Sequence, residues 1–343
     1  MKAIVLENYH NLVYKDVPDP RIKPDEVLVR VKACGICGSD VHGFDGSTGR
    51  RIPPVIMGHE ASGIIEKIGD AVIGFQPGDR VTFDSTIYPL NDWFTLQGKY
   101  NLSDNREVLG VSPGTYLRNG AFAEFVVVPQ HILYKLPENV TFEQAALVEP
   151  VAVALHALSL AGLQVGESCL VVGAGMIGLF LVQAASIAGA SPVIAVDLDK
   201  SKKEIAIRNG ATIFLDPETD DMEQIVKYYT TGRGCDLAFE AVGITQTVST
   251  AINLSRKGGR VILVGNISPT INFPLQRVVT HEIRIQGSCA IRGEYETALR
   301  LISAGKLNVN GMISAVVPLS EGAAWFERLY RKEPGLNKVL LVH

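Results

Sequence analysis

Three side chains in the N-terminal half of the chain carry the clearest metal chemistry. Cys37 offers a thiolate and His59 an imidazole, and together they form a soft ligand set that suits zinc. Glu60 adds a carboxylate beside His59, and Glu149 supplies another at the start of an apolar, helix-like run. The residues alone leave the site open. Cys34 and Cys37 form an isolated CxxC without a second pair, and a histidine between a glycine and a glutamate also fits a plain turn.

A second group of residues has the spacing of a dinucleotide-binding loop. Gly173, Gly175 and Gly178 follow the apolar run 169–172 in GxGxxG spacing, and a helical stretch comes next. These glycines permit the tight turn, the close approach of a pyrophosphate and the close packing of helix on strand. Asp197 ends the next apolar run, 19 residues after Gly178, where a carboxylate accepts both ribose hydroxyls and repels a 2′-phosphate. NAD is therefore favoured over NADP, with a predicted binding set of Gly173, Gly175, Met176, Ile177, Gly178, Asp197, Val242 and Val264.

Length and composition limit the class of protein. A chain of 343 residues is long enough for two domains, and 32 basic against 36 acidic residues give no sign of nucleic-acid or anionic-membrane binding. No apolar run reaches the ~18 residues of a membrane span, and the first ten residues predict a strand rather than a signal peptide. Five cysteines, mostly within apolar strands, argue against a disulfide framework and favour a reducing cytoplasm.

The elements that position these residues divide into two kinds. Short alternating runs separated by Pro, Gly and Asp turns predict an all-β unit as far as about residue 137, and the run 142–162 has helical periodicity. Strands and helices then alternate as in a doubly wound parallel sheet, until the pattern breaks down beyond about residue 285. The runs 315–318 and 338–342 are expected to be strands that return to the N-terminal unit. The predicted domains are 1–150, 151–285 and 286–343, the last belonging to the first domain.

Several motifs in a fixed order reveal a family resemblance. GHEASG at 58–63 is followed by GDRV at 78–81, GAFAEF at 120–125 and GAGMIG at 173–178, and this series resembles the zinc-containing medium-chain dehydrogenases. VEPVAV at 148–153 and CGSDVH at 37–42 look most like the sorbitol and threonine dehydrogenase branch. The resemblance covers essentially the whole chain. It implies an α/β Rossmann domain, which holds the doubly wound sheet, and a GroES-like β-rich catalytic domain.

The resemblance also implies roles for individual residues. Cys37, His59 and Glu60 match the family's catalytic zinc ligands, and Glu149 matches a carboxylate that binds zinc directly or through its water. Ser39 and His42 match a relay that carries the alcohol proton to solvent, and Asp40 matches an acid close to the metal. The implied reaction is the transfer of hydride from an alcohol, activated by zinc, to the nicotinamide of NAD.

The predicted residues discriminate among several functions. The favoured one is an NAD-dependent zinc dehydrogenase acting on a secondary alcohol of a polyol, cyclitol or sugar derivative, as a homodimer or homotetramer. A threonine-type or simple secondary alcohol dehydrogenase is the nearest alternative. A non-catalytic NAD-binding protein of the same fold has no use for a complete relay, and a zinc-free quinone reductase is opposed by His59, Glu60 and Glu149.

The sequence departs from the family where most zinc members bind a second, structural zinc with four cysteines. The family's spacing falls here on Pro89, Asp92, Thr95 and Ser103, none of which is a thiolate. We therefore expect one catalytic zinc and no structural zinc. Packing is expected to hold this lobe together through its aromatic residues, Tyr88, Trp93, Phe94 and Tyr100.

The substrate leaves the fewest marks in the sequence. Gly43 stands where sorbitol dehydrogenases tend to place an aromatic residue, which predicts an enlarged pocket. Arg50, Arg51, Arg118 and Arg292 are either solvated surface charges or, if two of them converge, a clamp for a phosphate or sulfonate on the substrate.

Overall fold

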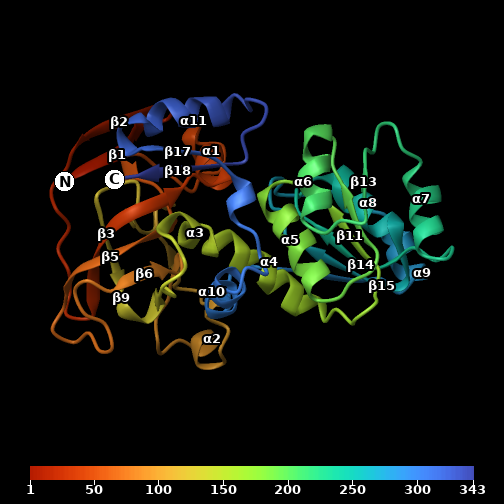
Figure 1. Ribbon diagram of the computed structural model, residues 1–343, viewed down its shortest axis with the longest axis horizontal. Helices are drawn as coiled ribbons and strands as arrows, with labels where there is room; N and C mark the ends of the chain where they lie inside the picture. The colour runs from red at the N-terminus through yellow and green to blue at the C-terminus, as the bar shows by residue number, and fades with distance from the viewer. The chain divides into compact units, whose positions relative to one another are not determined.

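The computed structural model describes residues 1–343 and divides into two compact units. The first comprises Met1–Glu149 together with Ile291–His343, and the second comprises Pro150–Ala290 (Figure 1). The second boundary lies five residues later than the sequence analysis placed it. The reason is that strand β16 (Arg284–Gly287) still belongs to the sheet of the second unit.

The largest sheet of the first unit brings the two ends of the chain together. Its order is β10-β6-β5-β3-β18-β17, and β9 also pairs with β3. Figure 1 shows the blue C-terminal strands beside the red N-terminal ones, and the predicted return of these two strands is confirmed. The strands are β3 (Glu26–Gly35), β5 (Glu60–Ile68), β6 (Arg80–Phe83), β9 (Phe125–Pro129), β10 (Leu133–Lys135), β17 (Ile313–Pro318) and β18 (Lys338–Val342).

Smaller elements complete the first unit. The sheet β2-β1-β4 consists of β1 (Lys2–Asn8), β2 (Asn11–Asp16) and β4 (Val55–Ile56), so the N-terminal run is a strand, as predicted. The pair β7 (Thr86–Ile87) and β8 (Glu107–Val108) frames the lobe. The helices are α1 (Gly38–Phe44), α2 (Trp93–Leu96), α3 (Phe142–Ala146), α10 (Tyr295–Ser303) and α11 (Gly322–Tyr330). Fully buried aromatic rings, including Phe83, Phe122 and Phe326, fill the core.

The second unit is a doubly wound sheet with strand order β13-β12-β11-β14-β15-β16, all parallel. The strands are β11 (Cys169–Val172), β12 (Val193–Val196), β13 (Ile213–Leu215), β14 (Cys235–Glu240), β15 (Ser255–Leu263) and β16. The helices are α5 (Met176–Ile187), α6 (Lys203–Arg208), α7 (Met222–Tyr229), α8 (Thr245–Leu254) and α9 (Leu275–Thr280). In Figure 1, α5 and α6 lie on one face of the sheet and α7, α8 and α9 on the other. This double cover explains why the central strands are continuously apolar.

Two features concern the joints between elements. Helix α4 (Val148–Ala161) contains the boundary between the units. Strands β14 and β15 end at Glu240 and Leu263, so Val242 and Val264 lie just beyond the carboxyl edge of the sheet, where parallel α/β folds bind ligands.

None of the helices combines the length and the apolar character that crossing a membrane requires.

Candidate metal centre and cofactor loop

The structure brings the three predicted zinc ligands of the first unit together. Cys37 precedes α1, His59 directly precedes β5, and Glu60 is the first residue of β5. Strand β5 pairs with β3 so that Glu60 lies opposite Gly35, close to the start of α1. As a result, one ligand atom of each of the three residues lies within 4.8 Å of the others.

The donor set and its surroundings fit zinc. Thiolate, imidazole and carboxylate are all ligands that zinc takes, and the three atoms lie close enough together to hold one ion. The space for the carboxylate is built into the fold. A Cβ atom at Gly35 would lie 2.3 Å from Glu60 Oε2, so any larger residue at this position would displace the ligand.

Asp40 faces the histidine of this cluster. Its Oδ1 lies 3.4 Å from His59 Nδ1, which leaves Nε2 of the imidazole as the ligand atom. Arg51 donates to the same oxygen from Nη2 at 2.7 Å. Burial alone would raise the pKa of the Asp40 carboxyl, but the charges of His59 and Arg51 together lower this pKa well below its usual range.

Lys338 holds the glutamate of the cluster, and the sequence analysis missed it. Its Nζ donates to Glu60 Oε2 at 2.5 Å and to the Ile36 carbonyl at 3.0 Å, and the residue is almost fully buried. Burial alone would lower the pKa of the Lys338 ammonium group. The negative charge of the neighbouring Glu60 has the opposite effect, and the net shift of the Lys338 pKa is upward. A signal was present, because a lysine opens the otherwise apolar final strand KVLLV.

Glu149 does not belong to the cluster of three ligand atoms. It is half-buried, and its Oε1 accepts a hydrogen bond from Ser85 Oγ at 3.2 Å. Burial, followed by the nearby charges of Glu60 and Asp84, raises the pKa of Glu149 to about 7 against the opposing effects of His59 and Lys338. The contact with Ser85 carried no signal in the sequence.

The two predicted relay residues share helix α1. Ser39 and His42 are three positions apart and therefore lie on the same side of the helix, and both are exposed. Ser39 Oγ lies 3.3 Å from Cys37 Sγ and accepts a hydrogen bond from Arg51 Nη2 at 3.1 Å. The serine of the proposed relay thus touches a metal ligand directly.

The structure corrects the prediction about Gly43. A Cβ atom there would lie 2.2 Å from Arg51 Cδ, because the arginine side chain packs across the glycine. Arg51 is only 3% exposed and fills the room that the missing side chain leaves. The glycine therefore accommodates this arginine and does not enlarge a substrate pocket.

The four arginines considered as an anion clamp divide into two pairs. Arg51 is bound to Asp40, and Arg118 lies 3.3 Å from Glu107 and 3.7 Å from Glu26. Both guanidinium groups are therefore neutralised by carboxylates. Arg50 is exposed and Arg292 half-buried, and neither makes an ion pair.

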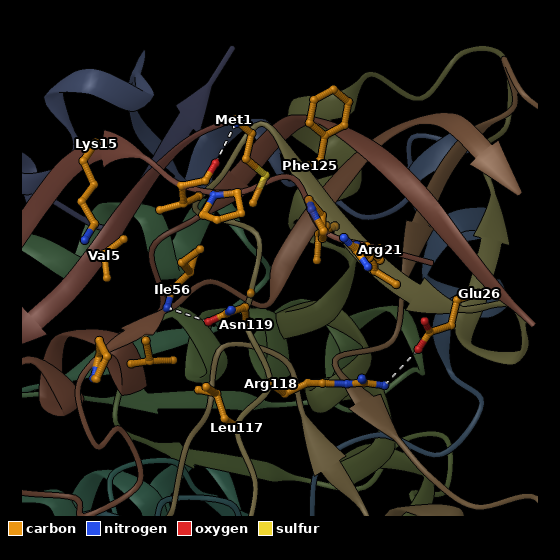
Figure 2. A pocket seen from close by; sticks show the side chains of 18 of the residues that line it. Met1, Val5, Lys15, Arg21, Glu26, Ile56, Leu117, Arg118, Asn119 and Phe125 are labelled. Carbon is orange, nitrogen blue, oxygen red and sulfur yellow. Dashed lines mark hydrogen bonds and ion pairs between the residues drawn. The ribbon is translucent and has the colours of Figure 1, made fainter. Parts of the chain in front are cut away.

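Arg118 lines a groove of about 570 Å³ on the first unit (Figure 2). Figure 2 shows Arg118 reaching towards Glu26 and Asn119 bound to the backbone of Ile56, and Met1 and Phe125 also line the groove. None of the predicted zinc or relay residues lines this groove. We therefore do not assign the catalytic chemistry to it.

The cofactor loop of the second unit has the geometry that its glycines predict. Gly173 has φ +94°, and a Cβ atom at Gly178 would lie 1.7 Å from the Gly173 carbonyl oxygen. Gly175 then caps α5, whose first turn contains Met176 and Ile177. The first backbone N–H groups of a helix have no partner within it, which is the feature that phosphate-binding loops use.

Asp197 lies beside this loop. Its Oδ2 accepts from Ala174 N at 2.5 Å, and its Oδ1 accepts from Asp199 N at 2.8 Å. Across the sheet edge, Glu240 fixes the turn around Val242 by accepting from the backbone N–H groups of Val242 and Gly243 at 2.9 and 2.7 Å. The sequence analysis missed this role of Glu240, although a charged residue ending a buried strand was a visible signal.

The lobe is held differently from the prediction. Asp92 caps α2 by accepting from Thr95 N at 2.8 Å, and its other oxygen accepts from Ser103 Oγ. Three of the four positions that carry cysteines in the family are thus joined by hydrogen bonds. The Tyr88 and Tyr100 rings stack at 4.2 Å as expected, whereas Trp93 is 68% exposed and contacts the Phe94 ring.

Comparisons with known proteins identify the family. The sequence model of the family described as alcohol dehydrogenase GroES-like domain matches residues 23–138. The model of the family described as zinc-binding dehydrogenase matches residues 177–304. D-xylulose reductase A of Aspergillus niger is 36% identical over 336 residues, covering 95% of this chain and 93% of the relative.

Solved structures agree with this assignment and confirm the predicted fold class. Alcohol dehydrogenase TADH from Thermus sp. ATN1 superposes with a TM-score of 0.94 at 34% identity, over 100% of this chain and 99% of that one. A zinc-binding dehydrogenase from Sinorhizobium meliloti 1021, bound to NADP, gives 0.90 at 32% identity with the same coverage. The chain therefore belongs to the zinc-containing medium-chain alcohol and polyol dehydrogenases, oxidoreductases that use zinc and a nicotinamide cofactor on small-molecule alcohols.

Proposed function

We propose that this protein is an NAD-dependent polyol dehydrogenase with one catalytic zinc per chain. The observation that carries the proposal is the convergence of Cys37, His59 and Glu60 within 4.8 Å, with Asp40 and Lys338 bound behind two of them. When bound there, zinc supplies a Lewis acid that lowers the pKa of an alcohol. Glu149 would contact the metal through a water molecule.

Two residues of this chain would carry the proton of the alcohol to solvent. We assign Ser39 and His42 to the relay because both are exposed on one side of α1 and Ser39 touches the thiolate of Cys37. An imidazole can both accept and donate a proton, which suits a proton carrier. Replacement of His42 by Ala should lower kcat mainly at low pH, where bulk hydroxide is scarce. A pH profile of kcat that is unchanged in this variant would remove His42 from the relay.

A neutral polyol is the substrate we favour. Arg51 and Arg118 are both paired with carboxylates, so neither guanidinium group is free to bind a phosphate on the substrate. The similarity to D-xylulose reductase A supports a sugar-derived alcohol and ketone pair. The test is reduction of D-xylulose with NADH, together with oxidation of neutral polyols, their phosphates, L-threonine and simple secondary alcohols. A preference for a phosphate, for L-threonine or for a simple alcohol would contradict this choice.

NAD is the cofactor we propose, on the basis of Asp197. Its carboxylate is fixed by two backbone N–H groups beside the glycine loop, so its negative charge lies where a 2′-phosphate would need room. The relative kcat/KM for NAD and NADP tests this directly. Asp197→Ala should weaken NAD by about 10- to 100-fold, since charge-assisted hydrogen bonds contribute roughly 1.5–3 kcal/mol, and should leave NADP less affected. Equal use of both cofactors by the wild type would contradict the assignment.

We also propose a homodimer or homotetramer. Strand β16 is the edge of the sheet in the second unit and is mostly exposed, so its backbone groups are open to pairing. Nearby in sequence, Phe273, Leu275 and Val279 are 43%, 61% and 66% exposed, which is a high apolar exposure for so short a segment. Light scattering of purified protein tests this, and Val279→Asp should shift the mass towards the monomer. A wild-type monomer would contradict it.

The cytoplasm is the compartment we propose. All five cysteines are free, and Cys34, Cys169 and Cys235 are buried in the two cores. Free thiols, including the proposed zinc ligand Cys37, persist in a reducing compartment. Fractionation of cells of the source organism, followed by immunodetection of the protein, tests this placement.

A further inference from the structure

Arg51 is a buried cation that the proposed chemistry does not use. Its side chain is 3% exposed, and both Nε and Nη2 donate to Asp40 Oδ1, at 3.2 and 2.7 Å. Nη2 also donates to Ser39 Oγ at 3.1 Å. A single guanidinium thus touches one residue behind the histidine ligand and one residue beside the cysteine ligand.

Asp40 links this arginine to the ligands themselves. Its Oδ1 faces His59 Nδ1 at 3.4 Å, and its Oδ2 accepts from the backbone N–H of Cys37 at 3.3 Å. The carboxylate is fully buried, so its charge requires a paired cation and its orientation requires more than one contact. Arg51 supplies the pairing cation, and its two donors fix which oxygen faces the histidine.

Gly43 provides the space in which Arg51 lies. A Cβ atom at this position would approach Arg51 Cδ to 2.2 Å and Cγ to 3.1 Å. These are atoms in the middle of a side chain whose guanidinium is bound at its far end, so they have little freedom to move away. The glycine and the arginine therefore form a matched pair, one on α1 and the other before β5.

We propose that Arg51 is a positioning residue of the zinc site, holding Asp40 against His59 and Ser39 against Cys37 from the space left by Gly43. The inference rests on the proposed function, because it assigns Arg51 a role towards the metal that Cys37 and His59 would bind. Arg51 itself does not belong to the ligand cluster and acts only through Asp40 and Ser39.

The contact with Ser39 also gives this hydroxyl a direction. A guanidinium has donors and no acceptor, so Ser39 Oγ accepts from Arg51 and must direct its own hydrogen elsewhere. Cys37 Sγ, at 3.3 Å, is the acceptor that the structure offers. Arg51 thus keeps the Ser39 hydrogen on the side of the metal ligands, where the proposed relay begins.

The first experiment measures metal binding rather than turnover. Arg51→Gln, Arg51→Lys and the control Arg50→Gln are prepared, and zinc affinity is measured by competition with a chromophoric chelator. Arg51→Gln should bind zinc about 10- to 100-fold more weakly, the usual effect of removing a partner that orients a ligand. Arg50 is the neighbouring exposed arginine without an ion pair, so Arg50→Gln should match the wild type. Arg51→Lys retains the charge beside Asp40 and should recover most of the affinity.

The geometry of the site is checked with cobalt. Co²⁺ substituted for zinc has a visible spectrum that reports ligand identity and symmetry, so Arg51→Gln should change this spectrum and Arg50→Gln should not. Thermal melting of the metal-free proteins shows whether Arg51→Gln is folded. Wild-type zinc affinity together with an unchanged cobalt spectrum in folded Arg51→Gln would overturn the proposal.

Gly43→Ala tests the same idea without removing the arginine. Alanine has a higher helix propensity than glycine, so a loss of zinc affinity in this variant would come from displacement of Arg51 and not from a weaker α1. In an Arg51→Ala background the added methyl has nothing to displace, so Gly43→Ala should then have no further effect. Additive losses would overturn the pairing of the two residues. If Arg51→Gln does not fold, Gly43→Ala in the presence of Arg51 decides the matter, because wild-type zinc affinity in that variant would overturn the proposal.

The two levels of the proposal fail in different ways. Wild-type protein that binds no zinc and oxidises no alcohol would remove the proposed function. Wild-type protein that binds one zinc and oxidises polyols, alongside unaltered zinc affinity in Arg51→Gln and Gly43→Ala, would remove only the role of Arg51.

Discussion

The ligand cluster around Cys37, His59 and Glu60 and the lobe from Tyr88 to Ser103 belong to the same unit but are held by different forces. At the cluster, the charges of Glu60 and of the neighbouring Asp40 are almost completely buried, and each is paired with a cation, Lys338 or Arg51. The lobe instead relies on a helix cap, a hydroxyl and two stacked rings. Side chains that present a metal ligand are held in position by buried ion pairs. Side chains that only keep a loop folded are held by hydrogen bonds and ring stacking.

This contrast shows which parts of the fold can lose a metal. In the lobe, a carboxylate accepting from a backbone N–H and a serine hydroxyl links positions that four thiolates and a zinc would otherwise join. The cluster has no such substitute, because removing one partner of a buried pair leaves an uncompensated charge. We expect substitutions in the two regions to differ accordingly in size and in kind.

The largest effect is expected at the cluster. His59→Ala removes a ligand and leaves Asp40 facing an empty position, so bound zinc should be lost and kcat/KM should fall by about 10³-fold, equivalent to several kcal/mol of transition-state stabilisation. Elemental analysis and steady-state kinetics measure both quantities. Ser103→Ala in the lobe is the control and should keep one zinc and near wild-type activity. Full activity of the wild type after complete zinc removal would contradict the prediction.

The next prediction turns the lobe into the kind of site it lacks. Pro89→Cys, Asp92→Cys, Thr95→Cys and Ser103→Cys together place four thiolates at the family's spacing, which zinc binds tetrahedrally. We expect two zinc ions per chain in this variant and one in the wild type. Metal analysis after extensive dialysis measures the count. Two tightly held zinc ions in the wild type would show that the lobe binds metal through other groups.

The two regions also differ in how far the sequence could predict them. The order of the motifs, the GxGxxG loop and the alternating strands and helices led to the correct fold class, and the His59–Glu60 pair led to the cluster. Local patterns carry this information because turns, strands and helix starts depend on neighbouring residues.

What the sequence could not provide is the pairing of distant side chains. Lys338 meets Glu60 across 278 positions, and that contact depends on β18 pairing with β3. Arg51 had the right type of side chain but the wrong expected role, because only packing reveals that it lies over Gly43. In the lobe, Asp92 directly before α2 was a visible helix-cap signal, because Asp is a preferred N-cap residue.

A smaller effect is expected from Asp84, which joins the lobe to the rest of the unit. Burial raises the pKa of Asp84 to about 6, above its unfolded value of 3.8. As the pH rises past 4 the unfolded chain loses this proton first, so the free energy of unfolding falls until about pH 6 and stays lowered above it. Asp84→Asn removes this titration. Relative to the wild type, the variant should gain about 3 kcal/mol between pH 4 and pH 8.

Urea unfolding of both proteins across this pH range measures the difference. Asn keeps an acceptor for the Thr86 N–H, and the changed contact with Tyr100 adds a term that does not vary with pH, so the pH dependence of the difference reports the charge. A stability difference between the two proteins that is constant with pH would show that Asp84 titrates normally.

The smallest effect is expected at Tyr100, whose hydroxyl donates to Asp84 Oδ2 at 3.0 Å and accepts from Gly293 N at 2.7 Å. Tyr100→Phe keeps the ring stacked on Tyr88 but removes both hydrogen bonds, which should cost about 1–3 kcal/mol of unfolding free energy. Since zinc and substrate do not touch this residue in our proposal, kcat/KM at moderate temperature should stay close to that of the wild type. In the Asp84→Asn background the hydroxyl faces an amide instead of a carboxylate, so Tyr100→Phe should cost less there, and the difference measures their coupling. A loss of activity as large as that of His59→Ala would show that the lobe shapes the catalytic site, and the contrast between the two regions would then fail.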